Sequence, residues 1–265
     1  MVSRPVRQRI QRSKFLKILL LDIETSLNKV YTFQLFKAYI PPKQIIEPTR
    51  ILCWAAKWLG EKKVHFASEQ EDDYIERIHK MVDEADGIIH YNGKAFDMKH
   101  LNREFLMRRL DPPSSYTDID LLTTMRQNFK MESNKLEWVS VQLGYEGKVQ
   151  HRGVQLWIDC QEKNDPKAWK EMKKYNVRDV TEMEPIYFDL LPWIKKHPNF
   201  GHYVEGDKVI CKFCGSDNLK KNGIERNTVV PYQRYQCLDC RSPLRGRSKV
   251  ERDENDRKML NPSTV

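Results

Sequence analysis

Several features are missing from this sequence, and each absence narrows its class. No apolar run approaches the roughly 18 residues that a membrane-spanning helix needs, and 31% of the residues are charged. The basic N-terminus lacks the apolar segment of a secretory signal, and no internal repeat is visible. We therefore expect an intracellular, cytoplasmic protein that does not bind membranes, with 265 residues available for one large domain or for a domain with an appended module.

A strong charge of either sign is also missing from most of the chain. Residues 18–204 hold 27 basic and 28 acidic side chains. Residues 1–17, by contrast, hold six basic and no acidic side chains, and residues 205–250 hold ten basic and five acidic ones. Positive flanks on a neutral body predict a polyanionic partner that is held outside the active site. The alternative is that the basic ends serve only solubility.

Three separated blocks carry the candidate chemistry: LLLDIET at 19–25, IIHYNGKAFD at 88–97 and YNVRD at 175–179. Asp22 and Glu24 follow an apolar run typical of a central strand, and strand alternation puts both side chains on one face. Tyr175 and Asp179 lie one helical turn apart and share a helix face. With Asp97, the carboxylates suit two Mg²⁺ or Mn²⁺ ions and in-line cleavage of a phosphodiester. Each block alone has a plainer interpretation: solvated acids, a helix N-cap, or a surface Tyr–Asp pair.

Hydrophobic patterning predicts the elements that carry these blocks. Strands are predicted where short apolar runs are bounded by turn residues: at 18–25, 51–58, 63–67 and 87–92. Helices are predicted where apolar residues recur at three- and four-residue spacing: at 70–85, 98–110, 136–143 and from the Asp165 cap to about Glu184, where Pro185 interrupts the last one.

Together the blocks resemble the DEDD superfamily of 3′→5′ exonucleases, in the branch with a tyrosine four residues before the last aspartate. They are also similar to the proofreading domains of B-family DNA polymerases and to stand-alone YprB-type RNase H-like domains, as is segment 133–144. The resemblance covers about 18–195 and implies an α/β fold, an RNase H-like mixed sheet flanked by helices. The rest of the chain is too short for polymerase palm and fingers, which implies a stand-alone or accessory nuclease.

The resemblance also implies roles for individual residues. The implied direct metal ligands are Asp22, Glu24 and Asp179, and Asp97 is implied to close the site. Tyr175 orients the attacking water. The implied substrate contacts are Thr25, Asn92 and Lys94. The chain departs from these families in a long insertion at 28–50 that holds Tyr31, Phe33, Phe36 and Tyr39. This insertion either shapes the pocket for the 3′ end or is structural padding, and we favour the first.

The six cysteines fall into two classes. Cys53 and Cys160 are isolated in apolar surroundings, as buried thiols are. The other four form two C-x-x-C pairs, which predict one structural Zn²⁺: Cys211, Cys214, Cys237 and Cys240. This module resembles the zinc ribbons attached to transposases. Its basic and aromatic side chains suit phosphate contact and base stacking: Lys220, Lys221, Arg226, Arg234, Arg241, Arg245, Arg247, Tyr232 and Tyr235. The alternative is a ribbon that docks a protein partner.

We thus predict a metal-dependent 3′→5′ exonuclease whose ribbon helps to bind nucleic acid, DNA being favoured over RNA. The alternatives are a structure-specific or transposase-like endonuclease of the same fold and a non-catalytic nucleic-acid-binding adaptor. The sequence predicts no oligomeric state. The expected parts are a basic arm at 1–17, an exonuclease domain at 18–196, a linker at 197–208, the zinc ribbon at 209–243 and a disordered tail at 244–265.

Overall fold

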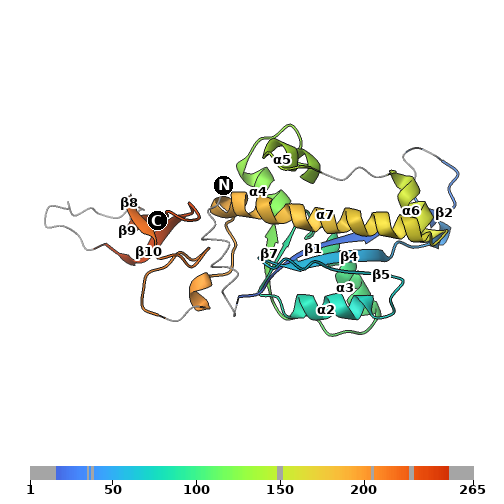
Figure 1. Ribbon diagram of the computed structural model, residues 1–265, viewed down its shortest axis with the longest axis horizontal. Helices are drawn as coiled ribbons and strands as arrows, with labels where there is room; N and C mark the ends of the chain where they lie inside the picture. The colour runs from blue at the N-terminus through green and yellow to red at the C-terminus, as the bar shows by residue number, and fades with distance from the viewer. Residues whose placement is uncertain are drawn as a thin grey trace, which may run out of the picture. The chain divides into compact units, whose positions relative to one another are not determined.

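The computed structural model describes residues 16–34, 36, 39–147, 152–203, 206–226 and 230–250. The chain divides into two compact units: a larger one of 17–190 with 195–197, and a smaller one that contains 191–194 and 198–250. Figure 1 shows the elements of both units. Residues 1–15 of the expected basic arm lie outside the described residues.

The larger unit is built on a five-stranded sheet with the order β5-β4-β1-β6-β7. The central strand β1 (Ile18–Thr25) pairs antiparallel with β4 (Ile51–Trp58) and parallel with β6 (Gly87–His90). β5 (His65–Ser68) and β7 (Thr117–Asp120) form the edges. A central strand is covered on both faces, which is why β1 begins as an unbroken apolar run. The predicted mixed sheet flanked by helices is confirmed.

Helices cover both faces of this sheet (Figure 1). α2 (Tyr74–Asp83) and α3 (Asp97–Met107) pack on one face, where Leu19, Leu21 and Ile23 join their core. α6 (Val154–Gln161) and α7 (Pro166–Leu190) pack on the other. Because side chains alternate along a strand, the apolar Leu21 and Ile23 leave Asp22 and Glu24 facing α7.

A β-bulge interrupts the pairing of β1 with β4 beside Glu24. The register pairs Glu24 with Cys53 but Thr25 with Ile51, so Leu52 is an extra residue on β4. Consecutive residues of a regular strand face opposite ways, but Leu52 and Cys53 both join the core beneath α6 and α7. Ile51 joins the opposite core.

Two shorter helices complete this unit. α4 (Leu121–Asn128) follows β7 directly, and its first turn is capped by Asp120, which accepts the N–H of Thr123 at 3.1 Å. α5 (Leu136–Gln142) ends before Gly144, whose φ of 82° is the left-handed conformation of a helix C-cap. No helix among the described residues is both long enough and apolar enough to cross a bilayer.

The predicted break at Pro185 is wrong, because α7 continues through it to Leu190. A proline inside a helix costs about 3 kcal/mol. Full burial of a large apolar side chain stabilises by roughly 1.5–3 kcal/mol, and Ile186, Tyr187 and Phe188 are all buried directly after the proline. Tertiary packing therefore outweighs the local preference.

The insertion at 28–50 contains a small two-stranded ladder. β2 (Lys29–Val30) pairs antiparallel with β3 (Ile45–Glu47), and the 3₁₀ turn η1 (Pro42–Gln44) precedes β3. Neither strand was predicted, because two-residue and three-residue strands leave no periodic signal. The same is true of α6, an eight-residue helix whose apolar side chains follow no clear period.

The smaller unit holds a three-stranded antiparallel sheet in the order β10-β9-β8: β8 (Leu219–Arg226), β9 (Pro231–Cys237) and β10 (Pro243–Lys249). Phe200, within the expected linker, lies in the 3₁₀ turn η3 (Phe200–His202). It is buried, and its N–H donates to the carbonyl of Lys212 at 2.7 Å. The expected disordered tail is wrong for 244–249, which form most of β10. Residues 251–265 lie outside the described residues.

Candidate active site

Three carboxylates from distant segments meet where β1 faces α7. Asp22 and Glu24 come from the end of β1, and Asp179 comes from α7. One oxygen of each lies within 4.8 Å of the others. The strand alternation and the helical spacing predicted from the sequence therefore place these three side chains together.

Burial and crowded negative charge raise the pKa of Asp22 well above its usual range. Burial of the carboxyl is the largest cause, followed by the charges of Asp97, Glu24 and Asp179. The side chain of Asn176 opposes this shift, because its Nδ2 donates to Oδ2 of Asp22 at 2.6 Å. A divalent cation would relieve the repulsion. The hard carboxylate oxygens that meet here are the donors that Mg²⁺ and Mn²⁺ prefer, so the residues present fit such ions.

Asp97 lies beside this cluster but does not join it within the same distance. It is buried at the first residue of α3, and its Oδ1 accepts the N–H of Ile23 at 3.0 Å. β1 pairs with β6 only as far as Leu20, so Asp97 binds β1 just beyond the end of that ladder. Burial is the main cause that raises the pKa of Asp97 to about 6. The helix N-cap is Phe96, and the plain N-cap interpretation of Asp97 is wrong.

Tyr175 is buried on α7, with the ring of Trp157 edge-on to it at 5.9 Å. Burial raises the pKa of its hydroxyl far above the usual value, and the negative charges of Asp179, Glu24 and Asp22 add to the shift. The phenol is therefore protonated at any physiological pH. It can donate a hydrogen bond to an oxygen in the site.

The other predicted substrate contacts are less closely gathered. Thr25 ends β1 next to Glu24. Asn92 has a φ of 73° and turns the chain between β6 and α3, where its carbonyl accepts the N–H of Ala95 at 3.0 Å. Lys94 is exposed. Burial opposes ionisation of Asp118, but the neighbouring His90 and, more weakly, the charge of Lys94 hold the pKa of that carboxyl below its usual range. The structure does not bring Lys94 into the carboxylate cluster.

His90 is a polar residue of the second block whose role was not predicted. It is fully buried, and its Nδ1 accepts the N–H of Gly93 at 2.9 Å. Its Nε2 lies 3.1 Å from Oδ1 of Asp118, so the geometry favours the tautomer with the proton on Nε2. A Cβ on Gly93 would approach the imidazole to 2.4 Å, so only glycine fits. His90 thus fixes the turn that leads from β6 to Asp97.

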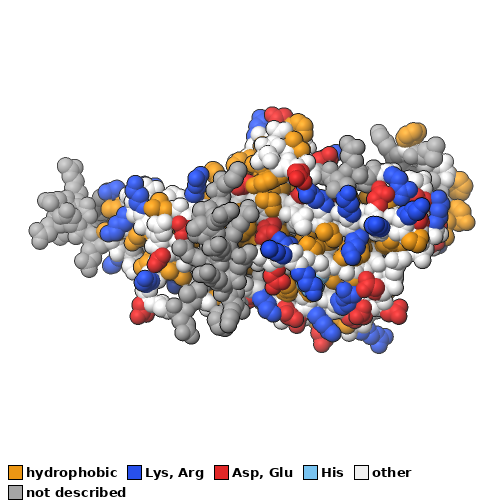
Figure 2. All heavy atoms as spheres, in the orientation of Figure 1, with side chains coloured by type: hydrophobic (Ala, Val, Ile, Leu, Met, Phe, Trp, Pro, Cys, Tyr) orange, Lys and Arg blue, Asp and Glu red, His pale blue; other side chains and the backbone are white. Residues whose placement is uncertain are grey.

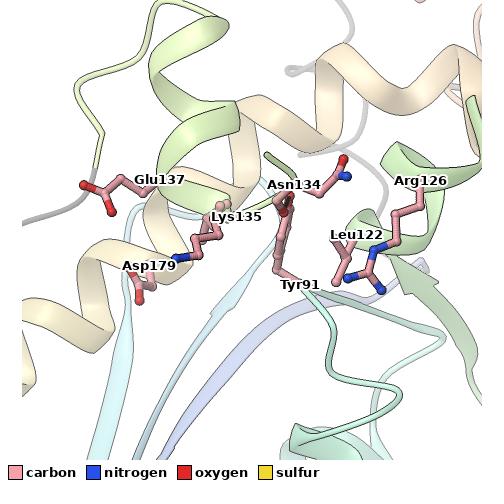
Figure 3. Close-up of a pocket in the computed structure, with 8 residues that line it drawn as sticks. Tyr91, Leu122, Arg126, Asn134, Lys135, Glu137 and Asp179 are labelled. Carbon is pink, nitrogen blue, oxygen red and sulfur yellow. Dashed lines mark hydrogen bonds between the residues drawn. The ribbon is translucent and has the colours of Figure 1, made fainter. Parts of the chain in front are cut away.

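A cavity of about 420 Å³ opens next to Asp179. Figure 3 shows Lys135 extending toward Asp179 and Arg126 on the other side of Tyr91. The hydroxyl of Tyr91 donates to the carbonyl of Asn134 at 2.6 Å, which fixes the ring in the wall. The cavity is lined by Tyr91, Leu122, Arg126, Asn134, Lys135, Leu136, Glu137 and Asp179. Arg126 and Lys135 were not predicted, because single basic residues between blocks carry no motif.

In the smaller unit the four predicted zinc ligands are buried with their sulfur atoms within 4.8 Å of one another. The Sγ atoms of Cys211 and Cys240 are 3.5 Å apart, and those of Cys214 and Cys237 are 3.7 Å apart. Four sulfurs at about 2.3 Å from a tetrahedral zinc are roughly 3.8 Å apart. The donor set therefore fits one Zn²⁺. Asp239 links the two knuckles, since it accepts the hydroxyl of Ser216 at 2.7 Å.

A match to a known protein family agrees with this fold. Residues 51–191, more than half of the chain, match the sequence model described as the RNase H superfamily. The chain belongs to the RNase H superfamily. Its five-stranded mixed sheet with flanking helices is accordingly RNase H-like, and nucleases of this fold use divalent metals.

One solved structure similar to this chain is the family B DNA polymerase from the hyperthermophilic archaeon Pyrobaculum calidifontis, with 18% identity and a TM-score of 0.49. The match covers 67% of this chain but only 25% of the polymerase. No curated protein sequence matches the chain.

Proposed function

We propose that the larger unit is a metal-dependent 3′→5′ exonuclease that hydrolyses nucleic acid, DNA in preference to RNA. The observation that carries this proposal is the convergence of Asp22, Glu24 and Asp179 within 4.8 Å, in an RNase H-like fold. The polarity rests on the tyrosine-type third block, Tyr175 to Asp179, which resembles that of 3′→5′ exonucleases.

Each side chain has a role that its contacts support. Asp22, Glu24 and Asp179 would hold two Mg²⁺ or Mn²⁺ ions, which supply a more acidic water and neutralise charge at the phosphate when bound. Asn176 keeps Asp22 turned toward the cluster through its 2.6 Å hydrogen bond. Tyr175, protonated by virtue of its raised pKa, would donate to the attacking water or to the phosphate and so orient them. Asp97 would complete the site through water.

The cavity beside Asp179 supports a nucleic-acid substrate. Arg126 and Lys135 place two cationic side chains around it, and cations of this kind contact phosphates. The half-buried ring of Tyr91 between them offers a face for a base. We therefore add Tyr91, Arg126 and Lys135 to Thr25 and Asn92 as proposed substrate contacts.

The small unit is proposed to be a zinc ribbon that assists substrate binding. Strand register places Lys220 beside Gln236, and Arg234 beside Arg245, on one face of its sheet. The guanidinium of Arg245 lies 4.7 Å from the ring centre of Tyr232. Changing Lys220 and Arg234 to glutamate should weaken binding of long strands and flatten its salt dependence, since fewer phosphate contacts release fewer counterions. Unchanged affinity and salt slope would favour a protein-docking ribbon instead.

Cleavage of 5′-labelled single-stranded DNA and RNA in the presence of Mn²⁺ tests the main proposal. The products should form a ladder that shortens with time, with DNA cut faster. Asp22→Asn and Asp179→Asn should each reduce the rate at least ~10³-fold, because a metal-dependent step loses several kcal/mol of stabilisation. The matched control is Asp189→Asn, on the same helix but bonded to Tyr145. Discrete internal cuts would favour an endonuclease, and undiminished cleavage by Asp22→Asn would refute the site.

A further inference from the structure

The insertion at 28–50 exposes four aromatic side chains that the proposed active site does not use. Their exposed fractions are 72% for Tyr31, 99% for Phe33, 86% for Phe36 and 85% for Tyr39. Figure 2 shows hydrophobic side chains gathered at the end of the larger unit where Figure 1 places β2. Exposed apolar surface of this density usually marks a binding site. We call these four residues the aromatic loop.

The base of the aromatic loop contacts α6. Lys29 forms two ion pairs of 2.7 Å, one with Glu47 across the β2–β3 ladder and one with Glu162 at the end of α6. The N–H of Leu27 donates to Oε1 of Gln161 at 3.0 Å. The segment that carries the exposed rings is therefore held at its base by these contacts.

The base of the aromatic loop lies close to the candidate active site. α6 packs its Trp157 against Tyr175, and Gln161 is four residues further along the same helix, which is about 6 Å at 1.5 Å per residue. On the other side, only four residues separate Glu24 from Lys29. Two independent connections, one through β1 and one through α6, thus place the base of the aromatic loop near the carboxylates.

We propose that Tyr31, Phe33, Phe36 and Tyr39 form a stacking platform for the unpaired bases of a single-stranded nucleic acid whose end occupies the carboxylate site. Every base has a π-face, so aromatic side chains bind a strand without regard to its sequence. Residues 28–47 also carry three lysines and one glutamate. Lys29 is paired with Glu47 and Glu162, so the positive charge that suits a phosphate backbone comes from Lys37 and Lys43. This inference rests on the proposed function for its occupant and assigns a site that the three sequence blocks do not contain.

Binding can be measured without cleavage, by fluorescence anisotropy of a labelled oligothymidylate in buffer with no added Mg²⁺ or Mn²⁺. The double variant Phe33→Ala/Phe36→Ala should bind at least about tenfold more weakly, given what one base–aromatic stack contributes. Phe33→Leu/Phe36→Leu should be equally weak, because leucine keeps the apolar area but has no π-face. An abasic strand of the same length should not distinguish the wild type from either variant.

The matched control is Leu106→Ala/Met107→Ala, which removes two side chains of 75% and 76% exposure from α3. It should bind like the wild type. Hydrolysis of a small phosphodiester by Phe33→Ala/Phe36→Ala should also be unchanged, so a failure of the nuclease proposal is separable from a failure of this one. Unaltered oligonucleotide affinity in the alanine variant overturns the platform. The proposal is also overturned if Phe33→Ala/Phe36→Ala loses binding to anionic vesicles while its oligonucleotide affinity stays intact. That result would assign the aromatic loop to a lipid surface.

Discussion

The small unit brings four thiols within 4.8 Å of one another, and the large unit does the same with three carboxylates. The two clusters draw on very different lengths of chain. The thiols come from residues 211–240, on two turns that share one sheet. The carboxylates come from residues 22–179 and meet only after β1 and α7 have packed. We expect the local cluster to need an ion in order to fold, whereas the distant cluster is brought together by the packing of a large apolar core.

The largest expected effect tests the local cluster. Structural zinc contributes on the order of 10–16 kcal/mol of apparent binding free energy, and a unit of this size has little core of its own. Cys237→Ser should therefore release zinc and make residues 206–250 sensitive to protease, while a small phosphodiester is still hydrolysed. Cys160→Ser, which changes a buried thiol outside the cluster, should do neither. A protease-resistant ribbon without zinc would contradict the comparison.

In the distant cluster, Tyr175→Phe removes one hydroxyl and leaves the buried ring in place. We expect kcat to fall about 10²-fold, the low end for a group that positions or protonates in the transition state. The KM and the Mn²⁺ dependence should change little, because no carboxylate is lost. Rapid kinetics over a range of pH measure this effect. A wild-type kcat across that range would remove the hydroxyl from the mechanism.

His90→Gln tests whether the turn before Asp97 needs the imidazole. The change removes Nδ1 as acceptor for the N–H of Gly93, and an unsatisfied buried donor costs about 1–3 kcal/mol. The protein should lose that much stability, measured by urea unfolding. The kcat should fall while the affinity for short strands stays the same, since His90 acts through Asp97 and not on substrate. His79→Gln, a partly exposed histidine on α2, is the control.

The smallest effect concerns the pH dependence of stability without divalent ions. The pKa of Asp97 is about 6 in the folded protein, above the 3.8 of an unperturbed carboxyl, and that of Asp22 is also raised. The folded state therefore binds protons more tightly than the unfolded chain does. The stability that these two carboxyls contribute should be fully present below about pH 4 and be lost as the pH rises through 6, as measured by thermal unfolding of the wild type against Asp22→Asn. Mn²⁺ at pH 7 should restore it, and Asp22→Asn should flatten the profile.

Local patterns were enough to predict much of this molecule. The alternation in 18–25 and the four-residue spacing of Tyr175 and Asp179 predicted which side chains would share a face, and C-x-x-C spacing predicted the thiol cluster. Asn176 of α7, by contrast, donates to Asp22, 154 residues earlier in the chain. No local pattern could reveal that contact. The cavity with Arg126 and Lys135 was missed for the same reason, because it exists only once α4, α5 and α7 are packed.

The bulge at Leu52 makes the site sensitive to the length of β4. Deleting that one residue would leave Ile51 and Cys53 on the faces they already occupy, in a regular ladder opposite Thr25 and Glu24. We expect the sheet to survive the deletion, with loss of the extra local twist that a bulge produces beside Glu24. Insertions in the aromatic loop, by contrast, would add only a few tenths of a kcal/mol of loop-closure entropy. We therefore expect deletion of Leu52 to lower the proposed cleavage activity while the architecture is kept.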